Sequence, residues 1–278
     1  MIVLESKKSL VQALQTYRGS NTTIGFVPTM GALHYGHISL VERCRKENGL
    51  TVASIFVNPT QFNDKSDLDC YPRSLEEDLD KLAAAGCDVV FTPSVAEMYP
   101  EADSRIFDFG MLDKVMEGSH RPGHFNGVAQ IVSKLFDITL PDKAYFGEKD
   151  FQQLAIIRRM VAMLNYSVQI VSCPTIREAD GLAMSSRNER LTHEQRRNAP
   201  IIAQTLFSCK EKIIDTPFDE LKKWVREQID SMPEMQTEYF EIADRNTLQS
   251  VDHYKESTLQ GCIAVRVGNI RLIDNISL

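Results

Sequence analysis

The sequence predicts an α/β fold: a doubly wound, Rossmann-like parallel sheet with a smaller C-terminal α+β domain. Short apolar runs that lack the alternation of a half-exposed strand suit a parallel sheet covered on both faces. Segments with apolar residues at helical spacing separate these runs, as βαβ units require. After Pro174 the pattern changes to long helical segments followed by short strands, which indicates a second domain.

The elements follow from these patterns in chain order. The parallel strands are expected over residues 23–27, 50–57, 87–91, 143–146 and 168–172. Helices are predicted between them over residues 38–48, 75–85, 128–140 and 154–164. We expect these elements to form one domain over residues 1–175. The smaller domain, residues 176–278, is predicted to hold helices over 192–215 and 218–232 and strands over 238–243, 262–267 and 270–273. Gly268 and Asn269 both accept positive φ and predict a hairpin between the last two strands.

Composition and charge narrow the class of protein. Of the 278 residues, 43% are hydrophobic and 25% charged, which is enough apolar material for a folded core. The net charge of -7, without any basic run, argues against a general nucleic-acid binder. No apolar stretch reaches the roughly 18 to 20 residues of a membrane span, and the N-terminus lacks a signal-peptide cleavage pattern. The six scattered cysteines include no CxxC pair, which favours reduced thiols in a cytoplasmic protein.

The stretch VPTMGALHYGH, residues 27–37, lies between a predicted strand and a predicted helix. Ligands of open α/β sheets bind at the carboxyl ends of strands, where helix N-termini present free N–H groups. Gly31 and Gly36 allow a phosphate to approach the backbone. His34 and His37 are three residues apart, and two imidazoles suit the charge that develops in phosphoryl transfer. A tight turn with incidental histidines is the plain alternative; zinc is disfavoured because no third ligand is obvious.

Polar side chains also follow two other predicted strands. Asn58 and Gln61 come after residues 50–57 and suit a polar organic substrate, although Asn-Pro is also a common turn. Lys149 comes after residues 143–146 and can neutralise phosphate charge. The alternative there, a capped helix with a solvated Lys149–Asp150 pair, is the commoner outcome for such a tetrad.

A fourth stretch, residues 177–191, places Ser185, Ser186 and Arg187 together, which suits a phosphate clamp or an ordinary loop with an N-cap. Because the first three stretches each follow a strand, they share one edge of one sheet, and the fourth can close over that edge. The residues therefore predict a nucleotide-phosphate site beside a polar substrate. The site is neither a P-loop nor a GxGxxG fold, since both motifs are absent.

Six motifs occur in the order of a known family: PTMGALHxGH, SIFVNPxQF, YPR, GHFxGV, FGEKDxQQL and READGLAMSSRN. With them the sequence resembles the pantoate–β-alanine ligase (pantothenate synthetase) family of the HxGH nucleotidyltransferase superfamily. The resemblance covers nearly the whole chain, and six motifs in register are highly specific. Tyr35 stands where the family usually has an acidic residue (LHEGH), a position we do not regard as catalytic.

The resemblance implies a carbon–nitrogen ligase of vitamin B5 and coenzyme A biosynthesis. Pantoate attacks the α-phosphate of MgATP to give pantoyl adenylate and pyrophosphate, and β-alanine then displaces AMP to give pantothenate. The substrates would be pantoate, β-alanine and ATP with Mg²⁺, with no tightly bound cofactor, no nucleic acid and no membrane. The family also suggests a homodimer formed through the N-terminal domain.

The resemblance also assigns roles to individual residues. The expected catalytic residues are His37 as proton donor, His34 and Lys149. Gln61 and Gln153 would orient pantoate, and Asn58 would support their pocket. The expected ATP contacts are Met30, Gly31, Ala32, Leu33, His34, Tyr35, Gly36, His37, Gly147, Glu148, Lys149, Asp150, Ile176, Met184, Ser185, Ser186 and Arg187. In the KMSKS-like segment at 184–187, the fork of Arg187 replaces a lysine and suits pyrophosphate.

Three questions stay open at this point. Glu77, Asp78 and Lys81 match positions where some family members are described as holding a metal. A charged lysine cannot ligate one, so we expect no protein-held metal and Mg²⁺ arriving on ATP.

The roles of Arg121 and His124 are not predicted. Two other functions are kept as alternatives: a nucleotidylyltransferase that stops at an adenylylated product, and a nucleotide-binding regulatory protein without the chemistry.

Overall fold

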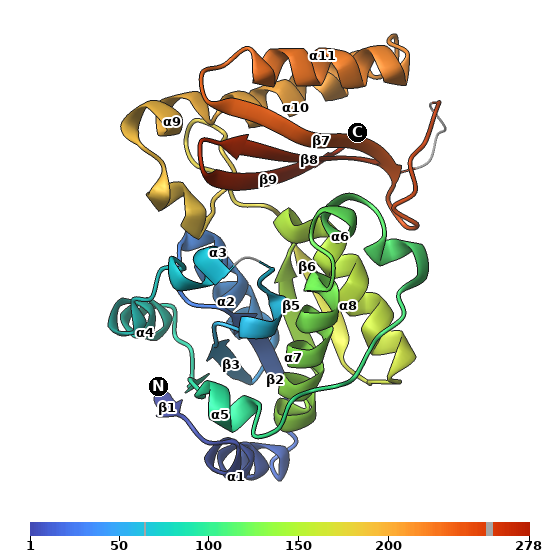
Figure 1. The fold of residues 1–278 in the computed structure, drawn as a ribbon. Helices are drawn as coiled ribbons and strands as arrows, with labels where there is room; N and C mark the ends of the chain where they lie inside the picture. The colour runs from blue at the N-terminus through green and yellow to red at the C-terminus, as the bar shows by residue number, and fades with distance from the viewer. Residues whose placement is uncertain (64, 254–257) are drawn as a thin grey trace. The chain divides into compact units, whose positions relative to one another are not determined.

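A computed structural model describes residues 1–63, 65–253 and 258–278 (Figure 1). By its backbone contacts the chain divides into two compact units. Unit 1 comprises Met1–Phe109, Arg121–Glu148 and Gln153–Pro174, and unit 2 comprises Gly110–His120, Lys149–Gln152 and Thr175–Leu278. Each unit has its own sheet and its own hydrophobic core. A division by backbone contacts does not show where independently folding domains begin. The domain boundary between residues 175 and 176 therefore stays a prediction.

Unit 1 contains a six-stranded parallel sheet in the order β1-β4-β3-β2-β5-β6. The strands are β1 (Ile2–Leu4), β2 (Ile24–Thr29), β3 (Leu50–Ile55), β4 (Val89–Phe91), β5 (Lys143–Gly147) and β6 (Gln169–Cys173). Neighbouring side chains of a strand point to opposite faces. In β2, Val27 lies in the core with Leu40 of α2 (Tyr35–Glu47). Phe26 packs edge to face on Phe136 of α7 (His124–Thr139), with ring centroids 6.3 Å apart. Helices thus cover both faces, and the predicted doubly wound sheet is confirmed.

The order of the strands reverses between β2 and β5. From β2 the sheet continues through β3 and β4 on one side, and through β5 and β6 on the other. The two central strands pair directly, with Gly25 opposite Lys143. The carboxyl ends of strands at such a reversal are the usual ligand site of an open α/β sheet. The stretches that contain His34 and Lys149 follow these two strands.

The other elements of unit 1 extend the predicted pattern. The helices are α1 (Lys7–Arg18), α3 (Lys65–Asp69), α4 (Leu75–Ala84), α5 (Val95–Met98) and α8 (Phe151–Met163), and η1 (Pro59–Gln61) is a 3₁₀ turn. The first two residues of α8 are counted with unit 2. Strand β1 was not predicted, because three residues give no periodic signal, and helices α1, α3 and α5 were not predicted either. Within the described ranges, no helix is long and apolar enough to cross a bilayer.

Unit 2 is built on an antiparallel sheet of β7 (Met235–Asp244), β8 (Leu259–Val267) and β9 (Ile270–Ser277). Its core lies between this sheet and α10 (Ile201–Lys212) and α11 (Phe218–Asp230), which bury Leu206 and Leu221 against Ile263. Shorter elements are η2 (Gly110–Asp113), α6 (Met116–His120), η3 (Glu148–Asp150), η4 (Ser186–Arg190) and α9 (His193–Asn198). The structure confirms the predicted α+β class of this part of the chain.

One helix prediction in unit 2 is wrong. The single helix expected over residues 192–215 is two helices, α9 and α10, separated at Ala199 and Pro200. Proline has no N–H to donate to the preceding turn, so the first helix ends, and Pro200 becomes the N-cap of the second. The predicted hairpin at Gly268 and Asn269 is present, with Gly268 at a φ of 57°.

Candidate active site

The loop after β2 is held in shape by side chains of α4. Gly31 and Ala32 have positive φ values of 81° and 49°. The backbone N–H groups of Ala32 and Leu33 donate to the two oxygens of the buried Asp78 carboxylate, at 2.8 and 2.7 Å. Lys81 donates to the Leu33 carbonyl at 2.8 Å. These contacts fix the backbone that the sequence predicts for phosphate binding.

His34 and His37 form a reciprocal cap at the N-terminus of α2. His34 Nδ1 accepts the Gly36 N–H at 3.1 Å, and His37 Nδ1 accepts the His34 N–H at 3.4 Å. The ring centroids are 4.1 Å apart. A ring nitrogen that accepts an N–H carries no proton, so the neutral rings are protonated at Nε2. The arrangement combines two Nε2–H donors with the positive end of a helix dipole, which suits phosphate oxygens.

Asn58 and Gln61 lie at the turn η1 after β3, and both are buried. Asn58 Nδ2 donates to Gln61 Oε1 at 3.3 Å and to the Gly127 carbonyl at 3.0 Å. Gln61 Nε2 lies 2.8 Å from the sulfur of Met30. The structure therefore brings Met30, from the predicted nucleotide loop, together with two residues of the predicted substrate pocket.

The backbone of Gln61 is held by the start of α7. His124 Nδ1 lies 2.7 Å from the Gln61 carbonyl oxygen, and its Nε2 lies 3.1 Å from Arg121 Nη1. A carbonyl only accepts, so the neutral imidazole donates through Nδ1 and accepts from Arg121 through Nε2. A Cβ on Gly127 would lie 2.3 Å from the Thr60 carbonyl oxygen, so glycine is needed for this close approach of η1 and α7. Arg121 and His124, whose roles were left open, thus contact each other and the Gln61 backbone.

The two glutamines at the start of α8 differ in their surroundings. Gln152 is buried and bonded to the segment before α7: its Oε1 accepts the Glu117 N–H at 2.9 Å, and its Nε2 donates to the carbonyls of Leu112 and Val115. Gln153 is half-buried. Gln152 therefore has a structural role, which leaves Gln153 as the ligand candidate of the two. At the end of β5, Gly147 and Glu148 are also half-buried.

In unit 2, Lys149 lies in η3. It forms the Lys149–Asp150 pair that was the alternative to a role in phosphate binding. Its Nζ is 3.7 Å from Asp150 Oδ1, and the Asp150 side chain is 47% exposed. The Lys149 side chain is only 19% exposed, and at 3.7 Å the pair is long for a charged hydrogen bond. The backbone carbonyl of Lys149 accepts from Asn275 Nδ2 at 2.8 Å. This bond ties Lys149 to β9.

The segment 176–187 forms a short hairpin in the same unit. The Met184 N–H donates to the Ile176 carbonyl at 3.0 Å. Ser185 is the N-cap of η4, and its hydroxyl accepts the Arg187 N–H at 3.2 Å. Ser186 is buried, and Arg187 is half-buried. The N-cap that was the alternative for this stretch is therefore present, with Ser185 as the capping residue.

Residue Asp274, which the sequence did not single out, holds that hairpin. Arg177 forms two hydrogen bonds with the buried Asp274 carboxylate, at 2.6 and 2.9 Å. Asp274 and Asn275 are adjacent on β9, so one point of the strand anchors both the hairpin and Lys149. Neither residue lies in one of the six motifs, and a strand pattern alone does not distinguish a core polar residue from a solvent-facing one.

The predicted site residues are distributed over both units. Unit 1 contains residues 30–37, Asn58, Gln61, Gly147, Glu148 and Gln153; unit 2 contains Lys149, Asp150, Ile176 and residues 184–187. Contacts join His34 to His37, and Asn58 and Met30 to Gln61, within unit 1.

The acidic start of α4 has a structural explanation. Both oxygens of Asp78 accept backbone N–H groups, and Lys81 Nζ lies 3.9 Å from Glu77. Among the residues that the structure describes, no group of three or more His, Cys, Asp or Glu side chains could hold a metal ion. The observed contacts of Asp78 and Lys81 are those of residues that support the loop.

Comparisons with known proteins agree on one family. The family described as pantoate-beta-alanine ligase matches residues 2–277. The chain is 55% identical to the pantothenate synthetases of Porphyromonas gingivalis, over 99% of both chains, and of Bacteroides thetaiotaomicron, over 99% of this chain and 98% of the other. Among solved structures, pantothenate synthetase from Thermus thermophilus matches with a TM-score of 0.93 at 43% identity, over 99% of both chains. The pantoate-beta-alanine ligase of Francisella tularensis, complexed with beta-gamma ATP and β-alanine, matches with a TM-score of 0.84 at 35% identity, over 100% of this chain and 97% of that one.

Proposed function

Because the chain belongs to the pantoate–β-alanine ligase family, we propose that it catalyses the ATP-dependent condensation of (R)-pantoate with β-alanine to pantothenate. In the first step a carboxylate oxygen of pantoate attacks the α-phosphorus of ATP, and pyrophosphate leaves. In the second step the β-alanine nitrogen attacks the acyl carbon of pantoyl adenylate, AMP leaves and the nitrogen loses a proton. The observation that carries the proposal is the pair of capped histidines at the point where the strand order reverses.

In this proposal the histidines act on the phosphates. With Nδ1 of each ring accepting a backbone N–H, the Nε2–H groups of His34 and His37 are the donors, and they favour the charge that builds up on the phosphate oxygens. His37 is the proton donor. Lys149 adds positive charge on the leaving pyrophosphate.

The substrate pocket in this proposal is formed by amide side chains. Gln61 and Gln153 orient pantoate, and Gln61 also lies near the β-alanine site. Asn58 supports the pocket through its bonds to Gln61 and to the Gly127 carbonyl. Buried amides of this kind discriminate well, because a ligand that lacks a matching group leaves them unpaired.

The remaining assignments complete the ATP site. Residues 30–37 form the nucleotide loop, residues 147–150 and Ile176 contact ATP, and residues 184–187 bind pyrophosphate. Residues 1–175 form the domain that binds nucleotide and pantoate, and residues 176–278 form a lid domain. Mg²⁺ arrives with ATP, and no tightly bound cofactor is needed. We also propose a cytoplasmic homodimer; the six unpaired cysteines fit a reducing compartment.

Product analysis tests this function. Purified protein is incubated with MgATP, D-pantoate and β-alanine, and each is omitted in turn. We expect AMP and pyrophosphate, with pantothenate only when all three are present. Pyrophosphate release with pantoate but no pantothenate on adding β-alanine would identify a nucleotidylyltransferase-like half-reaction. Binding of ATP without any turnover would support the regulatory alternative and overturn the catalytic assignments.

A further inference from the structure

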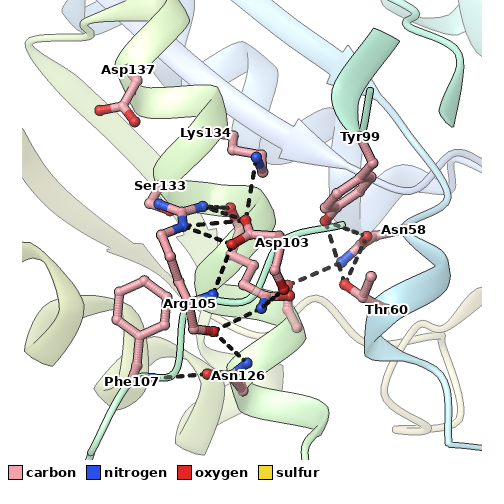
Figure 2. A network of polar contacts seen from close by, with 12 residues as sticks. Asn58, Thr60, Tyr99, Asp103, Arg105, Phe107, Asn126, Ser133, Lys134 and Asp137 are labelled. Atoms are coloured by element: carbon pink, nitrogen blue, oxygen red, sulfur yellow. Dashed lines mark hydrogen bonds and ion pairs between the residues drawn. The ribbon is translucent and has the colours of Figure 1, made fainter. Parts of the chain in front are cut away.

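A chain of hydrogen bonds leads from Tyr99 to Gln61. The Tyr99 hydroxyl lies 2.8 Å from Asn58 Oδ1, which also accepts the Thr60 hydroxyl at 3.1 Å (Figure 2). Asn58 Nδ2 donates to the Gly127 carbonyl at 3.0 Å and to Gln61 Oε1 at 3.3 Å. The oxygen of the Asn58 amide therefore has two donors, and both N–H groups have acceptors. Asn58 is 1% exposed, so no solvent competes for these bonds.

The orientation of the Asn58 amide follows from the Gly127 carbonyl. A backbone carbonyl only accepts, so the atom that faces it must be the amide nitrogen. The other N–H of that nitrogen then points at Gln61 Oε1. Gln61 in turn directs its own nitrogen away from Asn58, toward the Met30 sulfur at 2.8 Å. Gln61 thus presents N–H donors, which match a carboxylate or hydroxyl oxygen of a ligand and not an ammonium group.

Tyr99 is itself held in place by its neighbours. Its ring centroid lies 6.3 Å from that of Phe56, and Lys134 Nζ lies 5.3 Å from it on the ring face. Lys134 is in turn paired with Asp103 at 3.2 Å. Burial raises the pKa of the Tyr99 hydroxyl, so the group stays protonated and able to donate.

We propose that Tyr99 is a positioning residue for Gln61, acting through the Asn58 amide with Thr60 as the second support. The inference rests on the proposed function, in which Gln61 binds pantoate. Without the Tyr99 hydroxyl, the buried Asn58 oxygen loses a donor and the amide is less firmly held. The nitrogen of Gln61 is then less well directed at the substrate, so pantoate binding weakens while ATP binding does not.

Steady-state kinetics of Tyr99→Phe test this relay. We expect the KM for pantoate to rise about five- to tenfold, as for the loss of one net hydrogen bond, with kcat and the KM for ATP within about twofold. Thr60→Ala should act in the same direction, and Thr60→Ser should restore the wild-type KM because it keeps the hydroxyl. Tyr166→Phe is the matched control, since its hydroxyl donates to Asp137 at 2.6 Å and takes no part in the relay.

A double-mutant cycle separates the relay from a general loss of structure. In a Gln61→Ala background the relay has nothing to position, so adding Tyr99→Phe should leave the KM for pantoate unchanged within about twofold. An equal rise of the KM in both backgrounds, or an equal rise for pantoate and ATP, would overturn the proposal.

A measurement without substrate keeps the inference apart from the proposed function. Hydrogen exchange of the Asn58 side-chain amide, followed by NMR of ¹⁵N-labelled protein, should be slow in the wild type and in Tyr166→Phe, and faster in Tyr99→Phe. Unchanged exchange in Tyr99→Phe contradicts the relay. Wild-type protein that fails to make pantothenate contradicts the function, whatever the exchange rates show.

Discussion

The Asp78 carboxylate accepts the backbone N–H of Leu33 at 2.7 Å, so a residue of α4 holds the loop that precedes the histidine pair. The same carboxylate accepts the N–H of Ala32, whose φ of 49° lies in the left-handed region. That conformation costs a residue other than glycine roughly 1 to 2 kcal/mol. The two hydrogen bonds to Asp78 offset this cost and hold the loop in its conformation. Loss of the carboxylate should therefore affect both ATP binding and stability.

Replacement of Asp78 by Asn tests that relationship. The amide keeps one acceptor oxygen but turns an NH₂ group toward the other N–H, so one bond is lost and a repulsive contact is added. We expect the KM for ATP to rise at least about tenfold, and the free energy of unfolding to fall by about 1 to 3 kcal/mol. Asp80→Asn, at an exposed position of the same helix, is the control. Unchanged ATP kinetics in Asp78→Asn would mean that the loop holds its shape without the carboxylate.

Asp78 also shows how far the sequence predicts this site. Strands β2 to β6 and the histidine pair follow from local patterns, because βαβ units and helix starts are encoded over a few adjacent residues. The other residues of the six motifs were assigned through the family resemblance. From the sequence, Asp78 was considered as a possible metal ligand, and that role was not expected. Its spacing of four residues from Leu82 places both on the buried face of α4, which was a usable signal.

Contacts between distant segments were not predictable in this way. Tyr99 reaches Asn58 across 41 residues, and Arg177 reaches Asp274 across 97. Such pairs depend on how the elements pack, and no local spacing in a single sequence encodes them. The same limit applies to His124, whose role was not predicted and whose partner, the Gln61 carbonyl, lies 63 residues away.

His37→Ala should abolish most of the ligase activity. The variant removes the proposed proton donor, and we expect kcat to fall on the order of a hundredfold or more. Folding should survive, because the bond lost to the helix cap is long, at 3.4 Å. The turnover number and the thermal midpoint are measured together, with His193→Ala at an exposed position as the control. Near-wild-type turnover in folded His37→Ala would remove His37 from the mechanism.

Lys149→Ala should affect the adenylation step selectively. The ammonium group acts on ATP phosphates in the proposed mechanism, so pantoate-dependent pyrophosphate release should fall much more than the affinity for pantoate measured without ATP. Lys223→Ala removes an exposed lysine that pairs within its own helix and lies outside the predicted site, so it should change both quantities little. Parallel losses of adenylation and pantoate binding in Lys149→Ala would indicate a structural role for the lysine.

The contribution of Asp103 to stability should depend on pH. Hydrogen bonds from Arg105, and then Lys134, hold the pKa of the Asp103 carboxyl well below its usual range (Figure 2). In the unfolded chain the pKa is about 3.9, so the native pairing stabilises fully above that value and is lost as the pH falls through the lower folded pKa.

Asp103→Asn removes this pH-dependent contribution to stability. The difference in urea midpoint between wild type and variant should therefore be constant from about pH 7 to 5 and shrink below about pH 4. Arg105→Gln, which keeps the carboxylate but not its main partner, should lose less stability than the wild type as the pH falls below about 4, because the folded pKa of its Asp103 carboxyl lies closer to the unfolded value. A midpoint difference that stays constant down to about pH 3 would show that the folded pKa of Asp103 does not lie below its unfolded value.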